Sequence, residues 1–122
     1  MHDAHWLAAI DIGSNSFRLE IGRDEGGQVV RVEYLKETVR LGAGLDESSC
    51  LSAAAMRRGW DCLSRFGERL RGFDASRVRA VATQTVREAR NRAEFLAGAQ
   101  ARLGFPVDVI SGREEARLIY SG

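Results

Sequence analysis

A short polar turn follows an apolar run near the N-terminus. Asp11 lies close to the end of the apolar run Trp6–Ile12, and a carboxylate there is costly unless it is paired, hydrogen-bonded or near a metal. Such a turn can hold a phosphate while Asp11 holds Mg²⁺, directly or through water. The alternative is a plain hairpin turn in which Asp11 caps backbone amides. The phosphate donors would be the residues of the turn: Gly13, Ser14, Asn15 and Ser16.

Arg87 follows a later predicted strand, at the end of the segment Thr83–Arg87. In open α/β sheets, ligands bind outside the C-terminal ends of parallel strands. An arginine near a helix N-terminus can add its planar fork to an anion site there. The alternative is a surface arginine that pairs with Glu88 or Glu94, and the spacing alone leaves both interpretations open.

The segment Ser111–Glu115 carries a candidate general base. Its S-x-x-E spacing assigns Glu114 to a capping box with Ser111 at the start of a helix. Glu115 then has no capping role, and a carboxylate on the first turn of that helix can polarise a water molecule. The alternative is a solvated acidic residue that stabilises the helix N-terminus through the helix dipole.

Residue types exclude several other kinds of site. His2 and His5 are the only histidines, and both lie at the N-terminus, so no Ser-His-Asp triad can form. No Walker A sequence is present, and the G-x-G at residues 42–44 lacks the third glycine of a dinucleotide-binding fingerprint. Cys50 and Cys62 match no metal-ligand spacing, and we expect both to be reduced thiols.

The composition indicates one soluble globular domain. The chain has 122 residues, of which 44% are hydrophobic and 29% charged, and its formal net charge is +1. This near-neutral balance gives no electrostatic signature of a nucleic-acid partner. No apolar stretch approaches the ~18 residues of a membrane span, and the first residues carry no basic leader. We therefore expect a cytoplasmic protein with neither nucleic acid nor an integral membrane segment.

Apolar patterning predicts an antiparallel meander of three strands. They are expected at Trp6–Ile12, Phe17–Arg23 and Gln28–Leu41, with a glycine turn at residues 24–27. Residues 41–45 are expected to form a flexible turn.

Helices and strands alternate after this meander. Ser52 is the predicted N-cap of an amphipathic helix that ends at Gly72, and strands are expected at Val78–Thr83 and at residues 107–110. The resulting order, β-β-β-α-β-α-β-α, predicts an α/β fold with a mixed five-stranded sheet, as in the ribonuclease H-like lobe of actin-like (ASKHA) proteins. Capping-box spacing marks later helix starts at Thr85 with Glu88, Asn91 with Glu94 and Ser111 with Glu114.

Three segments, in this order, resemble the exopolyphosphatase / guanosine-pentaphosphate phosphohydrolase (Ppx/GppA) family. They read Asp-Ile-Gly-Ser-Asn-Ser-Phe at residues 11–17, Val-Ala-Thr-Gln-Thr-Val-Arg at 81–87 and Ile-Ser-Gly-Arg-Glu-Glu-Ala-Arg-Leu-Ile-Tyr at 110–120. Residues 51–63 are similar as well. The resemblance extends from about Leu7 to Gly122, and three ordered motifs are far more specific than one.

The resemblance implies hydrolysis of the terminal phosphate of inorganic polyphosphate or guanosine pentaphosphate, with Mg²⁺ as cofactor. By position, Asp11–Ser16 match the first phosphate loop, with Asp11 at the metal, and Arg87 matches an arginine of the phosphate site. Glu115 matches the catalytic glutamate. In the mechanism implied, Glu115 activates water for in-line attack on the terminal phosphorus, and Mg²⁺, loop amides and Arg87 stabilise the charge on its oxygens.

Family members continue into a second lobe, and the active site lies between the lobes. We therefore expect residues 1–122 to be the N-terminal ribonuclease H-like lobe, with little activity alone, and the full-length protein to be a homodimer. A non-catalytic sensor of polyphosphate or guanosine alarmone is the alternative function. An actin-like sugar kinase or ATPase lobe would share the first loop, but the Glu-Glu-Ala-Arg run at residues 114–117 argues against it. A ribonuclease H-type nuclease would need more clustered carboxylates.

Overall fold

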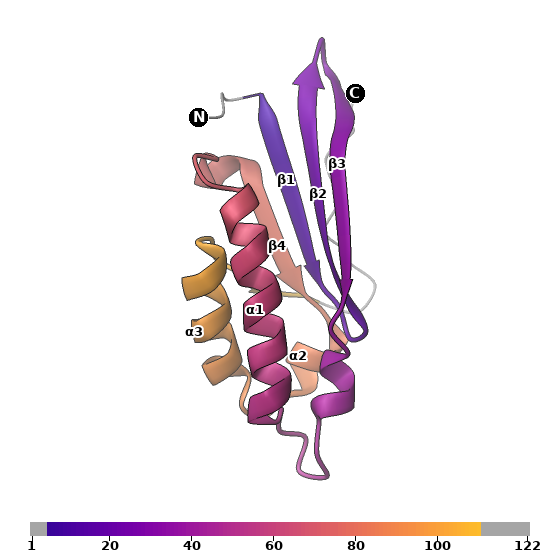
Figure 1. Cartoon of the computed structure of the whole chain (residues 1–122), viewed down its shortest axis with the longest axis vertical. Coiled ribbons are helices and arrows are strands. Elements are labelled where there is room, and N and C mark those ends of the chain that lie inside the picture. Colours follow the sequence, from indigo (N-terminus) through magenta and orange to yellow (C-terminus); the bar gives the residue numbers. More distant parts are fainter. Residues whose placement is uncertain (1–4, 111–122) are drawn as a thin grey trace.

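The computed structural model describes residues 5–110, which form a five-stranded mixed sheet with strand order β3-β2-β1-β4-β5 (Figure 1). The first three strands are an antiparallel meander, and the last two run parallel to β1. This is the sheet predicted from the sequence. Its strands are β1 (Trp6–Ile12), β2 (Ser16–Glu25), β3 (Gln28–Thr38), β4 (Val78–Ala82) and β5 (Asp108–Val109).

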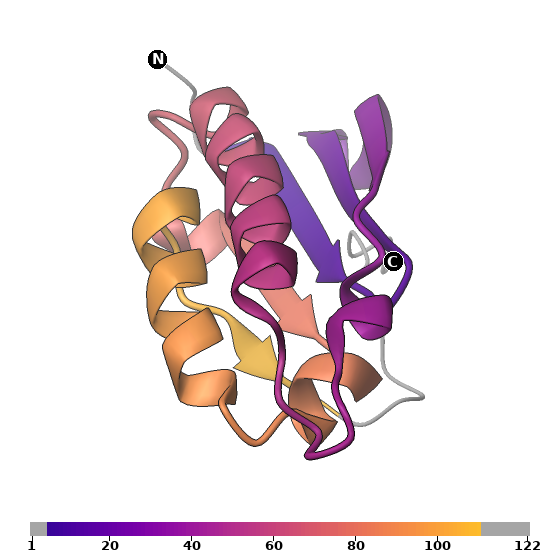
Figure 2. The same cartoon turned by 60° about the horizontal axis from the view of Figure 1, so that its bottom comes forward.

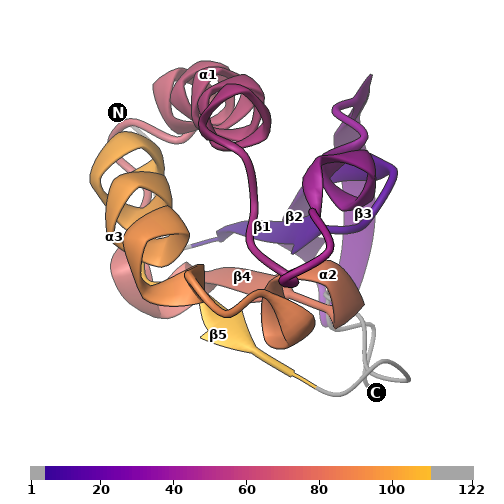
Figure 3. The same cartoon turned by 90° about the horizontal axis from the view of Figure 1, so that it is seen from below.

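Two long helices, α1 (Ala53–Arg69) and α3 (Arg92–Leu103), lie side by side on one face of the sheet, as the end-on view of Figure 3 shows. The apolar stripe predicted for α1 packs into the core with residues of β1, β2 and α3. Gly59 of α1 is needed for this contact, because a Cβ there would lie 3.2 Å from the ring of Phe17 and 3.1 Å from that of Phe95. Each large side chain buried here contributes about 1.5–3 kcal/mol, so this layer fixes the helices to the sheet.

A side-chain cap marks the start of α1, whereas α2 and α3 begin without one and differ from the predictions. Ser52 caps α1 as predicted, accepting a hydrogen bond from the backbone of Ala55. Asn91 occupies the N-cap position of α3, but its side-chain amide instead bonds the backbone N–H and carbonyl of Leu51, at 2.9 and 3.0 Å. The capping box predicted at Thr85 is wrong, because the short helix α2 (Gln84–Glu88) already contains that residue.

Residues 41–45 were expected to form a flexible turn, and most of them instead form a short 3-10 helix, η1 (Leu41–Gly44). Leu41 is fully buried, which anchors this segment in the core. A second such helix, η2 (Ala75–Arg77), precedes β4.

One end of the sheet brings together segments that are far apart in the sequence. β1 and β4 are parallel neighbours, so both strands end there, and the β1–β2 turn, η1 and α2 lie around these ends (Figure 2). Among residues 5–110, no helix has the length and apolar character needed to cross a membrane.

Candidate functional site

A pocket lies at this end of the sheet, beyond the C-terminal ends of β1 and β4. Asp11 and the β1–β2 turn line it together with Thr83, which follows β4. Two cationic residues, Arg18 of β2 and Lys36 of β3, complete the lining. The structure thus brings together the predicted metal-binding residue and all the predicted residues of the phosphate turn: Asp11, Gly13, Ser14, Asn15 and Ser16.

The turn itself is closed by a backbone hydrogen bond. The N–H of Gly13 donates to the carbonyl of Ser16 at 3.1 Å, and a Cβ on Gly13 would lie only 2.9 Å from that oxygen. A side chain at this position would therefore force the turn open. Ser14 and Asn15 are exposed, whereas Ser16 is buried, so the first two present their polar side chains to a ligand.

The carbonyl groups of the turn bond the segment that follows β3. Asn15 accepts from the backbone N–H groups of Val39 and Arg40, at 2.9 and 2.8 Å, and Ser14 accepts from Gly42 at 2.9 Å. These carbonyls are satisfied within the protein. The exposed side-chain groups of the turn are the hydroxyl of Ser14, which also accepts a hydrogen bond from Thr85, and the amide of Asn15, which also donates to Ser16 Oγ at 3.4 Å.

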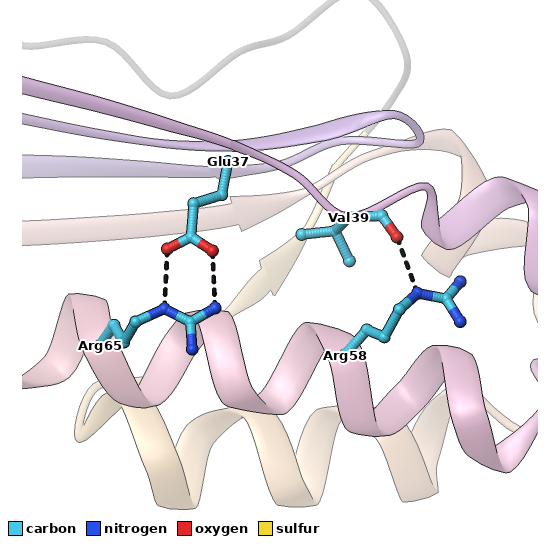
Figure 4. Close-up of polar contacts among 4 residues, drawn as sticks. All are labelled: Glu37, Val39, Arg58 and Arg65. Atoms are coloured by element: carbon cyan, nitrogen blue, oxygen red, sulfur yellow. Dashed lines mark hydrogen bonds and ion pairs between the residues drawn. The ribbon is translucent and has the colours of Figure 1, made fainter.

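Helix α1 holds the same segment from the other side, as Figure 4 shows. Arg58 donates to the carbonyls of Val39 and Arg40, at 3.1 and 3.3 Å. Arg65 donates to Glu37 through two of its nitrogens, with Nε–Oε2 and Nη2–Oε1 distances of 3.0 and 2.6 Å. These hydrogen bonds hold the pKa of Glu37 below its ordinary value. The end of β3, and with it the phosphate turn, is thereby fixed to α1.

Charged residues of three neighbouring strands lie in one row across the pocket. Asp11 pairs in register with Arg18, and Arg18 pairs with Lys36. Like charges directly opposite one another destabilise a sheet. In the part of the chain that the structure describes, Arg18 and Lys36 are exposed and form no ion pair with an acidic residue. An anion bound between them would relieve this repulsion.

Arg18, Lys36 and Thr83 were not singled out from the sequence. Strand periodicity could have found Arg18, because it pairs with Asp11 across the hairpin and must face the same side of the sheet. Lys36 depends on the register of the second hairpin, which the sequence alone does not give.

The two remaining predicted residues are placed differently. Arg87 lies on α2, but it does not line the pocket, and its Nη1 donates to the carbonyl of Ile110 at 3.0 Å. It also forms no ion pair with Glu88 or Glu94, the alternative partners, as far as residues 5–110 show. Glu115, with the rest of the segment from Ser111 onward, lies outside the described residues.

The donor set of the pocket fits Mg²⁺ carried by a phosphate substrate. Residues 5–110 contain no cluster of three or more histidine, cysteine or acidic residues that could enclose a metal. Mg²⁺ usually keeps several waters and binds through one or two carboxylates plus substrate phosphates. A single carboxylate, Asp11, beside a phosphate turn provides such a partial set.

A larger pocket lies at the opposite end of β1 and β4, lined by Leu7, Ala8, Val78 and Pro106 among other residues. Its lining is mainly apolar, and it lies at the N-terminal ends of the parallel strands. Ligands of open α/β sheets bind at the other end. We therefore place the functional site at the polar turn.

Comparison with known proteins identifies the family of the chain. The sequence model of the Ppx/GppA phosphatase family matches residues 21–122. A protein of Vibrio cholerae serotype O1 (El Tor Inaba N16961) named guanosine-5'-triphosphate,3'-diphosphate pyrophosphatase is 54% identical over 115 residues. The match covers 94% of this chain and 23% of that protein, so the chain spans about a quarter of this relative's length.

Solved structures show the same fold. The Aquifex aeolicus member of the Ppx/GppA family has a TM-score of 0.79 at 31% identity, covering 87% of this chain and 35% of its own. An exopolyphosphatase from Cytophaga hutchinsonii has a TM-score of 0.80 at 27% identity, and the match covers 88% of this chain and 34% of that one. The ribonuclease H-like, actin-like lobe expected from the sequence is thus confirmed. The family model matches residues 21–122, most of the sequence, so the chain belongs to the Ppx/GppA phosphatase family.

Proposed function

We propose that residues 1–122 form the N-terminal lobe of a phosphohydrolase that releases terminal orthophosphate from guanosine pentaphosphate or inorganic polyphosphate. The observation that carries this proposal is the polar turn beside Asp11, Arg18 and Lys36. A substrate with several phosphates has enough negative charge to engage both cations. The name of the Vibrio cholerae relative supports guanosine pentaphosphate, and that of the Cytophaga hutchinsonii structure supports polyphosphate.

In the proposed mechanism, the turn binds the terminal phosphate and Arg18 and Lys36 bind the phosphates that follow it. Asp11 would hold Mg²⁺, which supplies charge neutralisation on the phosphate oxygens. Glu115 accepts a proton from water as the water oxygen bonds the terminal phosphorus in line with the departing bridging oxygen. The shortened phosphate chain leaves with the electrons of the broken bond. For Arg87 to reach a phosphate, its guanidinium would have to leave the carbonyl of Ile110.

We further propose that turnover requires the rest of the protein. Among residues 5–110, the pocket is lined by β1, the β1–β2 turn, β2, β3 and the residue after β4, and the chain matches 23% of the Vibrio cholerae relative. A second lobe would close the pocket and exclude bulk water, which strengthens electrostatic stabilisation of the transition state. The isolated 122-residue chain should therefore fold but release little orthophosphate.

The test is Mg²⁺-dependent orthophosphate release by the full-length protein, measured with each substrate. Replacing Glu115 by glutamine should lower kcat by about 10²–10⁴-fold, the usual contribution of general base catalysis. Glu114→Gln is the matched control, because glutamine can still complete the capping box, and it should retain most activity. Equal losses in both variants would remove Glu115 from the mechanism. Binding of both substrates without release from either would point to a sensor.

The full-length protein is also proposed to be a cytoplasmic homodimer. Cys50 and Cys62 are both free thiols, which suits a reducing compartment. Burial raises the pKa of Cys62 to about 12, so this thiol stays protonated and unreactive. Cell fractionation and the molar mass from light scattering test these two statements, and recovery in an exported fraction or a monomer mass would contradict them.

A further inference from the structure

We propose that Thr85 is a positioning residue that orients the hydroxyl of Ser14 toward the bound phosphate. This inference rests on the proposed function of the polar turn and adds a residue that does not itself contact substrate. Thr85 lies in α2, 71 positions along the chain from Ser14, yet their hydroxyl oxygens are 2.5 Å apart. It is the one side-chain hydrogen bond between α2 and the turn within the described residues.

The surroundings of Thr85 allow little freedom. Thr85 is only 5% exposed, and buried hydroxyl groups need a hydrogen-bond partner. Gly42 packs against both residues. A Cβ at Gly42 would lie 3.1 Å from Thr85 Oγ1 and 3.4 Å from Ser14 Cβ. The N–H of Gly42 also bonds the carbonyl of Ser14. Three segments thus meet at this contact, and the absence of a side chain at Gly42 makes the approach possible.

The direction of the hydrogen bond gives the contact its role. The hydroxyl of the buried Thr85 donates to Oγ of the exposed Ser14. Ser14 then keeps its own proton for a group in the pocket, which it lines. A hydroxyl that accepts one hydrogen bond is polarised and donates a second one more strongly. Thr85 therefore leaves Ser14 as a donor to phosphate.

The test is a double-mutant cycle in the full-length protein, with kcat and KM measured for orthophosphate release. Thr85→Val keeps the shape and removes the hydroxyl, and we expect kcat/KM to fall by up to about tenfold, the size of one hydrogen bond between uncharged groups. Thr85→Ser should restore at least half of wild-type kcat/KM. In a Ser14→Ala background, Thr85→Val should change kcat/KM by less than about twofold, because its effect passes through Ser14.

Equal losses from Thr85→Val with and without Ser14 would overturn the proposal, as would failure of Thr85→Ser to restore activity in a variant that melts like the wild type. If the wild-type protein releases no orthophosphate, the proposed hydrolysis fails. The affinity of the same four variants for Mg²⁺-tripolyphosphate is then measured by calorimetry. The loss of affinity caused by Thr85→Val must again depend on the presence of Ser14. A wild-type protein that neither releases phosphate nor binds tripolyphosphate would contradict both proposals.

Discussion

Asp11, Arg18 and Lys36 occupy adjacent positions on three strands, and their charges define what the pocket can bind. The carboxylate is suited to a cation and the two basic residues to an anion. A Mg²⁺-bound chain of phosphates carries both charges in one ligand. Of the two basic residues, Lys36 lies on the edge strand, farthest from the turn. We therefore expect Lys36 to contact an internal phosphate of the chain and not the terminal phosphate.

Replacing Lys36 by glutamine should raise KM for polyphosphate and leave kcat nearly unchanged. An exposed charge pair contributes up to about 1 kcal/mol, which is about fivefold in KM. The rise should shrink at high salt, because exposed charges are screened. Arg79→Gln removes an exposed charge from β4 outside this pocket and serves as the control. Similar KM values for the two variants would show that Lys36 acts only through net charge.

At the scale of elements, a chain of hydrogen bonds (a relay) connects α1 to the polar turn at residues 13–16 and positions it. Arg58 bonds the carbonyls of Val39 and Arg40, and the N–H groups of these two residues bond the carbonyl of Asn15. The ion pairs Arg65–Glu37 and Arg69–Glu33 attach β3 to the same helix. The helix that forms much of the core thus also sets the position of the site.

Replacing Arg58 by alanine should lower the free energy of unfolding by about 1–2 kcal/mol, since two hydrogen bonds from a charged group are lost. It should also raise KM, because the turn would lose its support. Arg57→Ala is the matched control, because Arg57 is exposed and forms no side-chain hydrogen bond or ion pair with the described residues. Chemical denaturation of both variants measures the difference, and equal stability would contradict the relay.

The Glu37–Arg65 pair should make stability depend on acid pH. The pKa of Glu37 is lowered by hydrogen bonds from Arg65, so its contribution is fully present above the unfolded pKa of about 4.3 and is lost as pH falls through the lower folded value. The pair is partly exposed, which limits this contribution to about 1 kcal/mol or less at pH 7. Glu37→Gln should therefore be less stable than wild type at pH 7, and this difference should shrink as the pH falls below about 4.3. A difference in the free energy of unfolding that does not change between pH 7 and pH 3 would contradict this origin, and Glu68→Gln on α1 is the control.

At the scale of the whole molecule, the sequence predicted the sheet, the long helices and the polar turn, because these depend on apolar periodicity and local turn chemistry. It did not predict Lys36. Counting back from the pair Glu25–Gln28 would place Leu35 opposite Arg18, but a β-bulge near Val32 shifts the register by one residue. A shift of one residue exchanges the two faces of a strand, so Lys36 instead of Leu35 pairs with Arg18.

Long-range contacts account for the other differences. Thr85 and Asn91 have capping-box spacing, yet their side chains bond Ser14 and Leu51, which lie far away in the sequence. Arg87 likewise bonds the end of β5. The local sequence pattern favours helix capping by these side chains. Their actual hydrogen-bond partners are set by tertiary contacts, which the local pattern does not predict.

The central claim is that phosphate chains bind at the β1–β2 turn, and amide chemical shifts test it most directly. The ¹⁵N-labelled chain of residues 1–122 would be titrated with tripolyphosphate in the presence of Mg²⁺. We expect the largest shifts at residues 13–16, with smaller ones at Arg18, Lys36 and Thr83, and weaker binding in the Ser14→Ala variant. Shifts concentrated at Arg77 and Arg79 in the opposite pocket, with residues 13–16 unchanged in a folded spectrum, would contradict the claim.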